Sequence, residues 1–325
     1  MSGRPIGVYG IGNALVDLQV RVSESELATL AVCKGGMQLV DVRQQQALLA
    51  NVRGSTETHA GGSAANTVVG LTQMGTTAAY ACSVGDDALG LEYRRQMAQH
   101  GVMLPTAPKQ GAVSGTCLIL ITPDAERTMN TNLAVSAELC EDDISEQTIR
   151  QSDWLYVEGY LFASPSGAQA ALHAMELARR HGTRVALTLS DAFIVQGFRT
   201  HVERAVQTLC DLVFANHTES EAYTGLADPE QALRELRRQL PMAVVTYGAN
   251  GSWLDLGAGP VYVAAEAVKA VDLTGAGDMY AAGVLHGLVH RWDAQRAGHL
   301  GARAAARVVT QMGARLAGDL RDLAA

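Results

Sequence analysis

Residues 271–278 read Val-Asp-Leu-Thr-Gly-Ala-Gly-Asp, and the fold is expected to be arranged around this stretch. It lies between an extended-looking segment that begins at Val261 and a run of small and apolar residues from Met279, which suits a buried helix. The stretch is therefore expected to form a loop that enters a helix N-terminus. Because Gly275 and Gly277 have no side chains, an anion can approach the unpaired N–H groups and the positive dipole end there.

Asp278 closes this stretch and places an acidic side chain beside the predicted anion site. A phosphate bound there would repel it, which makes a carboxylate at this position unusual. One interpretation is a helix cap, a position that Asp favours. The other is a general base that takes the proton of an attacking hydroxyl. Local spacing does not separate the two.

Composition restricts the class of protein. The 325 residues can bury a large core, as one big domain with an excursion or as two domains. A net charge of −8 without a Lys/Arg block argues against nucleic acid as a partner. The five cysteines are scattered and form no C-x-x-C pair, which fits a reducing compartment better than disulfides or zinc. With no signal-peptide layout and no long apolar run, we expect a cytoplasmic protein that does not span a membrane.

The N-terminal segment carries a Gly-x-Gly after a short apolar strand from Ile6. The third glycine of a dinucleotide-binding fingerprint would fall on Leu15, and the following residues alternate with a period near two. A strand is therefore expected where that fingerprint needs a helix. Asn13 and Asp17 are then free to bind adjacent hydroxyls of a small polyol, or they are a turn Asn and a surface Asp.

A second glycine-led helix start follows at Gly61 and Gly62. Ser63 is expected to cap this helix, and Asn66, one turn in, to point back over the same spot. A simple tight turn is the alternative. Two such helix starts in one chain favour a shared cleft.

A small sheet separate from the main body is predicted from strands near residues 14–22 and 37–40 and from a hairpin of residues 116–122 and 127–133. Arg127, on this hairpin, is either a surface charge or a group that reaches a phosphate when the small sheet closes. After residue 140, short apolar strands alternate with helices, which indicates a parallel sheet covered on both faces. Ligands of such sheets bind beyond the carboxyl ends of the strands. Residues just after those ends are Glu158, Asn216, Glu219 and Gly248.

Five motifs in this order resemble those of the ribokinase (PfkB) superfamily of sugar and nucleoside kinases, and the resemblance covers nearly the whole chain. They are Asn13-x-x-x-Asp17, Gly61-Gly62-x-x-x-Asn66, Asn216-x-x-Glu219, Thr246-x-Gly248-x-x-Gly251 and DLTGAGD at residues 272–278, in which Leu273 replaces the usual Thr. The resemblance implies a three-layer α/β/α sandwich with a mostly parallel, doubly wound sheet and a small β lid. The large domain would take residues 1–13, 51–108 and 136–325, and the lid residues 14–50 and 109–135.

The resemblance also implies roles for individual residues. Asp278 would be the general base, with an anion hole at Gly275, Ala276 and Gly277 and Arg127 as an extra donor. The substrate hydroxyls would be bound by Asn13, Asp17, Gly61, Gly62, Ser63 and Asn66. ATP would be bound by Asn216, Thr246, Gly248, Gly251, Thr274 and His299. Glu219 would act on Mg²⁺ indirectly, through water, and a monovalent cation such as K⁺ is a further candidate ion.

Three stretches, at residues 114–117, 187–198 and 296–305, resemble the adenosine kinases within this superfamily. By that likeness Leu39, Met129 and Leu133 would lie against the purine, and Tyr160 or Phe162 would pack on the base. Glu158 disagrees, because it resembles a carboxylate that sugar kinases use on a hydroxyl.

The expected reaction is transfer of the ATP γ-phosphoryl group to the 5′-hydroxyl of adenosine, giving AMP. A kinase of ribose, fructose or a similar polyol is the alternative, and a nucleoside- or sugar-binding protein without catalysis is another. The partners expected are a small-molecule substrate and ATP, and the protein is either a monomer or a homodimer.

Overall fold

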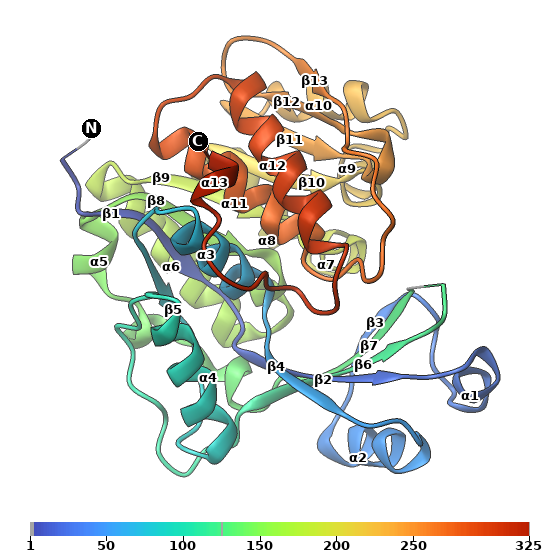
Figure 1. The fold of residues 1–325 in the computed structure, drawn as a ribbon. Helices are drawn as coiled ribbons and strands as arrows, with labels where there is room; N and C mark the ends of the chain where they lie inside the picture. The colour runs from blue at the N-terminus through green and yellow to red at the C-terminus, as the bar shows by residue number, and fades with distance from the viewer. Residues whose placement is uncertain (1–2, 125, 325) are drawn as a thin grey trace.

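An eight-stranded sheet forms the centre of the larger part of the molecule (Figure 1). The structure is a computed structural model that describes residues 3–124 and 126–324. The strand order is β13-β12-β11-β10-β9-β8-β1-β5, with parallel pairing from β11 to β5 and antiparallel pairing of β12 with both neighbours. The strands are β1 (Ile6–Ile11), β5 (Ala78–Ala81), β8 (Ser152–Glu158), β9 (Arg184–Thr188), β10 (Leu212–Asn216), β11 (Met242–Thr246), β12 (Ser252–Asp255) and β13 (Val261–Val263).

Both faces of this sheet are apolar and covered by helices. In β8, Trp154 and Tyr156 belong to one buried cluster, whereas Leu155 and Val157 belong to another. Since successive side chains of a strand point to opposite faces, these clusters are the two interfaces of a three-layer α/β/α sandwich. The expected mostly parallel sheet is confirmed.

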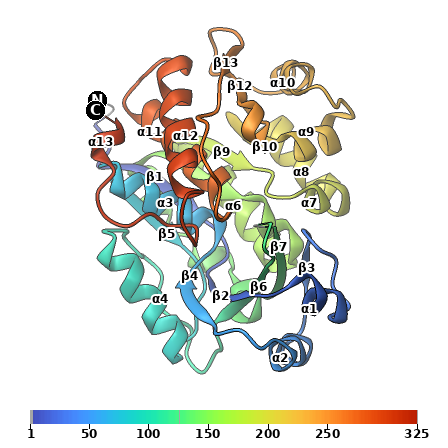
Figure 2. The same cartoon turned by 45° about the vertical axis from the view of Figure 1, so that its right-hand side comes forward.

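The helices divide between the two faces (Figures 1 and 2). The first face carries α3 (Ser63–Gln73), α4 (Ala88–Gln99), α11 (Ala276–Val289), α12 (Ala294–Val308) and α13 (Arg321–Ala324). The second carries α5 (Glu146–Arg150), α6 (Pro165–His181), α7 (Ala192–Gly197), α8 (Arg199–Arg204), α9 (His217–Thr224) and α10 (Pro229–Arg237).

A five-stranded sheet projects from this body and forms the lid (Figure 1). Its order is β3-β7-β6-β2-β4, from β2 (Leu15–Arg21), β3 (Met37–Leu39), β4 (Glu57–Ala60), β6 (Gly115–Ile121) and β7 (Arg127–Asn132). Two helices, α1 (Glu24–Thr29) and α2 (Val42–Asn51), supply apolar residues that pack with Leu118 and Leu120 on one face. The other face carries Cys117 and Ile119, which line the cavity described below.

One boundary from the sequence is corrected. The first lid segment is expected to end at residue 50, but β4 pairs with β2, with Val16 opposite Ala60, so the lid strands continue to Ala60. The short polar stretch of β4 has no apolar alternation that would have marked it as a strand. By contrast, the strand expected after the N-terminal Gly-x-Gly is confirmed as β2, which leaves no helix there to receive a pyrophosphate.

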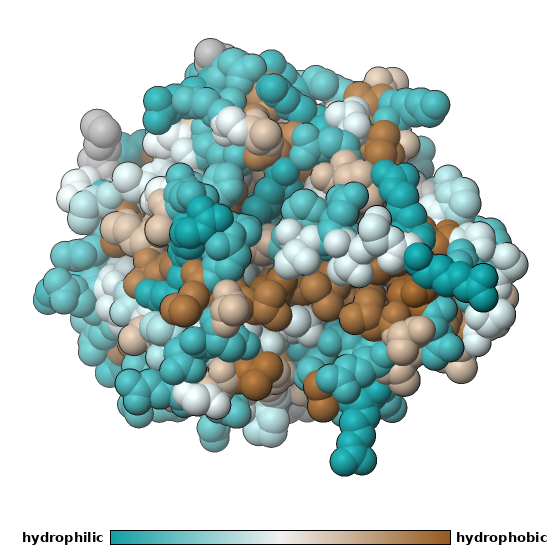
Figure 3. Space-filling view, turned by 60° about the horizontal axis from the view of Figure 1, so that its bottom comes forward, coloured by the Kyte–Doolittle hydropathy of each residue, from teal (hydrophilic) through white to brown (hydrophobic). Residues whose placement is uncertain are grey.

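On the side of the molecule where the lid and α4 lie, hydrophobic side chains gather in a band across the middle of the surface, between hydrophilic ones (Figure 3). In the described part of the chain, no helix is long and apolar enough to cross a membrane. The five cysteines are free, as expected from their spacing.

Candidate active site

A cavity of about 290 Å³ lies between the lid and the carboxyl edge of the large sheet. The strands β8 to β11 end at this cavity, with Glu158, Thr188, Asn216 and Thr246 in its wall. The N-termini of α3 and α11 complete one side. The cavity therefore joins the two glycine-led helix starts, as the sequence predicts.

The helix α11 begins at Ala276, and its N-cap is Gly275. Gly275 has a φ of 78°, and a Cβ there would collide with the backbone of Ala314, so a side chain is excluded for two reasons. Ala276 donates its N–H to the carbonyl of Leu273 (3.3 Å). The N–H groups of Gly277 and Asp278 are then the donors without an intrahelical partner that a helix N-terminus leaves.

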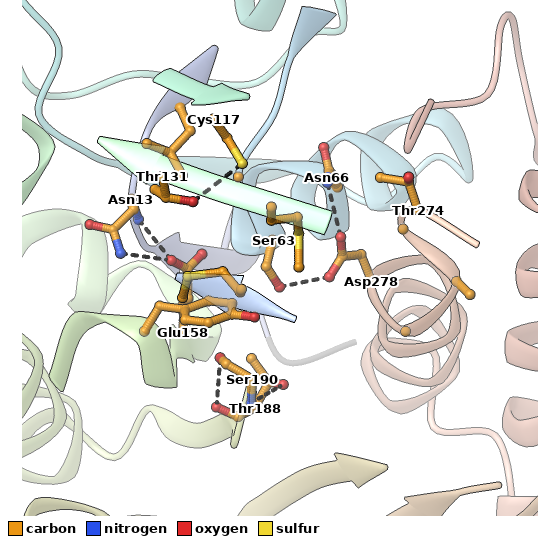
Figure 4. A pocket seen from close by; sticks show the side chains of 18 of the residues that line it. Asn13, Ser63, Asn66, Cys117, Thr131, Glu158, Thr188, Ser190, Thr274 and Asp278 are labelled. Atoms are coloured by element: carbon orange, nitrogen blue, oxygen red, sulfur yellow. Dashed lines mark hydrogen bonds between the residues drawn. The ribbon is translucent and has the colours of Figure 1, made fainter. Parts of the chain in front are cut away.

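Asp278 is the third residue of α11 and does not cap it, so the capping interpretation is wrong. Its Oδ1 accepts a hydrogen bond from Ser63 Oγ (2.6 Å), and its Oδ2 accepts one from Asn66 Nδ2 (2.9 Å) (Figure 4). Desolvation raises the pKa of Asp278, against the opposing effect of these two bonds and of Arg127 and Arg315.

The expected capping role of Ser63 is also wrong. The N-cap of α3 is Gly62, with a φ of 94°, and Ser63 is the first helical residue. With a positive φ at Gly62, the Ser63 hydroxyl donates to Asp278 and makes no capping hydrogen bond to a backbone group of its own helix. Asn66, one turn in, does point to the same spot.

Arg315 was not anticipated by the sequence. It lies in the segment after α12, and its Nε donates to Asn66 Oδ1 (2.9 Å) while Nη2 donates to the carbonyl of Gly61 (3.2 Å). An isolated Arg more than 200 positions from Asn66 in the chain gives no local signal of such a contact.

Glu158 is 1% exposed and held entirely by protein donors. Oε1 accepts from the backbone N–H of Asn13 (3.1 Å) and from its Nδ2 (3.0 Å), and Oε2 accepts from the N–H of Ala64 (2.9 Å). Asn13 Oδ1 in turn accepts from Ser136 Oγ (3.2 Å). Burial raises the pKa of Glu158 to about 7. These bonds tie the end of β1 to the start of α3.

Asp17 lies on the lid strand β2 with its carboxylate over Gly61, where any Cβ would collide with it. Its side chain is in the cavity wall, and within the described ranges no protein group hydrogen-bonds to its oxygens. Burial raises the pKa of Asp17 to about 7, opposed chiefly by Arg315 and Arg127. A buried carboxylate without donors is suited to accept hydrogen bonds from a ligand.

The lid side of the cavity is apolar. Leu39, Met129 and Leu133 all line it, although Leu39 is 46% exposed. They are joined by Leu15, Met37 and Ile119. Tyr160 also lines the cavity, whereas Phe162 is buried at 1% exposure and stacks on His201 with ring centroids 6.0 Å apart. Of these two aromatic residues, Tyr160 is therefore the one that a ligand can reach.

The opposite end of the cavity contains Asn216, Glu219, Thr246 and Thr274. Asn216 and Glu219 form a capping box at the start of α9, with both carboxylate oxygens accepting from Asn216 (3.0 and 2.6 Å). Burial raises the pKa of Glu219 to about 7. Thr274 donates its hydroxyl to Asp272.

Arg127 reaches from the lid to this end of the cavity. Its Nε lies 3.9 Å from Asp272 Oδ1, and the side chain is in the cavity wall. The surface-charge interpretation is therefore wrong, and the guanidinium lies beside the loop for which the sequence predicts anion binding.

The donor set agrees with a loosely held Mg²⁺. No group of three His, Cys, Asp or Glu in the described ranges is placed to bind a metal ion. Glu219 is one carboxylate in the wall, and Mg²⁺ commonly takes one or two carboxylates with waters and substrate phosphates.

Four of the expected site residues are outside the cavity lining: Gly61, Gly248, Gly251 and His299. The carbonyl of Gly61 accepts a hydrogen bond from Arg315, and its Cα lies against the Asp17 carboxylate. His299 is exposed on α12, where its Nε2 lies 2.7 Å from Gln295 Nε2. Ser190, which was not expected at the site from the sequence, lines the cavity in a left-handed conformation (φ 69°). Because it follows the end of β9, the strand-end rule that selected Glu158 would have selected it.

Comparison with known proteins gives consistent matches. A family model described as pfkB family carbohydrate kinase matches residues 32–319. The crystal structure of the adenosine kinase from Sinorhizobium meliloti is 36% identical, covers 98% of both chains and superposes with a TM-score of 0.94. The structure of a probable sugar kinase protein from Rhizobium etli CFN 42 is 32% identical, with 99% of this chain and 98% of that chain covered and a TM-score of 0.95. A 5-dehydro-2-deoxygluconokinase of Geobacillus kaustophilus is 28% identical over 78% of this chain and 79% of the relative.

Proposed function

The chain belongs to the pfkB family of carbohydrate kinases, and we propose that it phosphorylates the 5′-hydroxyl of adenosine with ATP, giving AMP. Its fold is the ribokinase-like α/β fold, and sugar and nucleoside kinases are among the proteins it resembles. Kinases of this family differ in the molecule whose hydroxyl receives the phosphoryl group.

The proposal rests on one observation: the half of the cavity where the phosphoryl acceptor would bind has an apolar part and a polar part. Its lid side is apolar, with Met129 and Leu133 in the wall, and Asp17 lies nearby with no hydrogen-bond donor in the part of the chain that the structure describes. A nucleoside has a flat base whose two faces suit an apolar wall and a ribose with two adjacent hydroxyls, so it matches both features. A free sugar has hydroxyls around its ring and would leave them unpaired against the apolar wall.

Glu158 favours the same acceptor for a different reason. The carboxylate already accepts three hydrogen bonds from Asn13 and Ala64, so it acts as a support for the strand end and the helix start. The solved adenosine kinase with 36% identity over 98% of the chain adds support.

Asp278 acts as the general base in this proposal. A carboxylate cannot fully ionise an alcohol in the ground state, so it orients the hydroxyl and accepts its proton as the new P–O bond forms. Ser63 and Asn66 hold both of its oxygens in place while the hydroxyl approaches. The proton moves to the carboxylate, the γ-phosphoryl group to the 5′-oxygen, and ADP leaves.

Stabilisation of the transferred phosphoryl group supplies most of the rate enhancement. The N–H groups at the start of α11 and the Arg127 guanidinium donate to the equatorial oxygens. Magnesium would neutralise charge on the phosphates, and Glu219 and Asn216, which line the cavity, would hold its water shell. The lid excludes water, which would otherwise accept the phosphoryl group.

A sugar kinase is the second candidate. Glu158 lines the cavity, and relatives of this chain include a 5-dehydro-2-deoxygluconokinase. A sugar hydroxyl bound to Glu158 would have to share the carboxylate with its three present donors.

The test is a panel of acceptors given to the purified protein with ATP and Mg²⁺. The panel contains adenosine, inosine, guanosine, ribose, fructose and 5-dehydro-2-deoxygluconate, with ADP formation and the phosphorylated product both measured. We expect kcat/KM to be highest for adenosine, with AMP as product. A higher kcat/KM for a free sugar would replace adenosine with that sugar, and no phosphorylation of any acceptor would favour a binding protein without catalysis.

A further inference from the structure

We propose that Arg315 is a positioning residue that fixes the carboxamide of Asn66, and through it the general base Asp278. The inference rests on the proposed function, in which Asp278 accepts the proton. Arg315 lies on the loop that joins α12 to α13, outside all five motifs singled out from the sequence.

The Asn66 carboxamide has two ends of nearly equal shape and opposite hydrogen-bonding character. Its oxygen accepts from Arg315 Nε (2.9 Å), and its Nδ2 donates to Asp278 Oδ2 (2.9 Å). Figure 4 shows the oxygen of Asn66 turned away from Asp278. Because a guanidinium only donates, it selects the orientation in which the NH₂ group faces the carboxylate. In the flipped orientation the amide oxygen would face Asp278 and repel it.

The guanidinium can impose this choice because its own position is fixed. Its Nη2 donates to the Gly61 carbonyl (3.2 Å), and its Cζ lies 6.0 Å from the centre of the Tyr93 ring. Tyr93 also donates its hydroxyl to the Gly61 carbonyl (3.1 Å). Each contact places the side chain beside the start of α3.

The loop that carries Arg315 is fixed on both sides. Before Arg315, the N–H of Gly313 donates to Asp272 Oδ2 (2.8 Å), in the anion-binding loop. After it, Gln73 Nε2 donates to the carbonyls of Leu316 (2.6 Å) and Gly318 (3.0 Å). Since Gln73 ends α3 and Asp272 precedes α11, the loop bridges the two helices whose N-termini meet at Asp278.

This arrangement determines how the base meets its substrate. An ionised carboxylate has about four acceptor positions on its two oxygens. Ser63 takes one on Oδ1 and Asn66 takes one on Oδ2, which prevents rotation of the carboxylate and leaves the remaining positions for the acceptor hydroxyl. Without Arg315 the Asn66 carboxamide can flip and lose its hydrogen bond to Asp278, and the Asp278 carboxylate can then rotate.

Charges around Asp278 set the direction of the pH effect. The cations are Arg315 and, from the lid, Arg127, and both lower the pKa of Asp278. The acids that interact with it are Asp17, Glu158 and Glu219, and the phenol of Tyr156 also interacts with its charge. Removing Arg315 takes away a cation and an ordered hydrogen bond, and both changes favour the protonated carboxyl. The acid limb of the pH–rate profile is then expected at higher pH.

The test compares Arg315→Met, Arg315→Lys and the control Arg307→Met. Arg307 is an exposed residue of α12, and its guanidinium lies 3.3 Å from the surface carboxylate of Asp322. We expect Arg315→Met to lower kcat by about 100-fold, to change KM for the acceptor by less than about threefold, and to move the acid limb of kcat up by about one pH unit. Arg315→Lys keeps the charge but not the planar fork, so it should restore the limb and only part of kcat. Arg307→Met should match the wild type.

A double-mutant cycle with Asn66→Ala separates positioning from general loss of structure. If Arg315 acts through Asn66, Arg315→Met should lower kcat by less than about threefold in the Asn66→Ala background, because the two effects are not additive. Thermal unfolding of every variant identifies any that fails to fold, and Arg315→Lys then serves in its place.

Wild-type kcat and an unmoved acid limb in Arg315→Met would overturn the inference while leaving the kinase assignment intact. Equal losses of kcat with and without Asn66 would also overturn it. A wild-type protein that phosphorylates none of the acceptors would instead overturn the proposed function and remove the basis of the inference.

Discussion

At the residue scale, the role of Asp278 depends on contacts from another helix. Its position three residues into α11 is compatible with several uses of an Asp, but its oxygens accept from Ser63 and Asn66 at the start of α3. A capping Asp would bond to its own helix end.

The variant Asp278→Asn tests this assignment. The carboxamide has nearly the same shape but cannot accept the proton, so kcat should fall by about 10² to 10⁴-fold. Adenosine affinity, measured by calorimetry, should stay within about threefold of the wild type. The exposed Asp142, changed to Asn, is a matched control and should leave kcat unchanged. Turnover of Asp278→Asn within a few-fold of the wild type would contradict the assignment.

Asp17 is the residue for which stability and binding are expected to oppose each other. Burial raises its pKa to about 7, and it has no protein donor among the described residues. Its ionised form therefore opposes folding, and this cost is complete above the folded-state pKa and disappears as the pH falls toward the ordinary value. The substrate hydroxyls would offset it.

For Asp17→Asn we expect a free energy of unfolding higher than that of the wild type by on the order of 2 kcal/mol at pH 8. The difference should shrink as the pH falls from 8 to 5. Adenosine should bind about 10-fold more weakly, because a charge-assisted hydrogen bond is lost. Urea unfolding across this pH range and calorimetry measure the two effects. A variant that is less stable than the wild type and binds adenosine equally well would show that Asp17 is structural.

At the scale of elements, α9 combines a structural device with a proposed functional one. Asn216 and Glu219 form a reciprocal capping box, yet both side chains line the cavity at the end where we propose that the phosphates bind. A cap explains the hydrogen bonds without any ligand. The charge of Glu219, however, is not needed for capping, because Gln serves equally at that position.

The variant Glu219→Gln uses this difference. The free energy of unfolding should change by less than about 1 kcal/mol, whereas the Mg²⁺ concentration for half-maximal rate should rise by about 10- to 100-fold. Glu26→Gln is the control, since Glu26 occupies the same position in the exposed capping box of α1. An unchanged Mg²⁺ dependence for Glu219→Gln would assign this residue to capping alone.

At the scale of the whole molecule, the cavity exists because the lid lies over the carboxyl edge of the large sheet (Figure 2). The lid supplies the apolar wall, Asp17 and Arg127, while the body supplies Asp278 and the strand-end residues. In the proposed function, substrate preference would therefore be a property of the lid, and phosphoryl transfer would need both parts.

Met129→Ala tests the role of the lid in binding the base. Met129 is half-buried on β7 and faces the cavity, so its truncation should raise KM for adenosine by about 10-fold with a smaller effect on kcat. Met103→Ala, at a 46% exposed site remote from the cavity lining, is the control and should keep the wild-type KM. Steady-state kinetics with adenosine gives both values. If Met129→Ala kept the wild-type KM, the apolar lid face would not be the site of the base.

Much of the architecture was predictable because it depends on local patterns. The short apolar strands from β8 to β11 and the alternating helices identified a parallel sheet, and the glycines before Ser63 and Ala276 identified two helix starts. The strand β4 was not predicted from the sequence, because its own residues are polar. Its extended conformation is fixed by its pairing with β2 in the lid sheet. Long-range pairing leaves little trace in a single sequence.

The sequence by itself determined the fold class, the two glycine-led helix starts and the set of polar residues at the strand ends, because hydrophobic periodicity and backbone permissiveness are encoded within a few residues of each position. Only the tertiary structure decided which of those polar groups are free and which are already used. Among the described residues Asp17 has no hydrogen-bond donor, Glu158 already accepts from Asn13 and Ala64, and Arg315, from the C-terminal loop, donates to Asn66. Hydrogen-bond partners and desolvation depend on segments far apart in the chain, and folding alone brings them together.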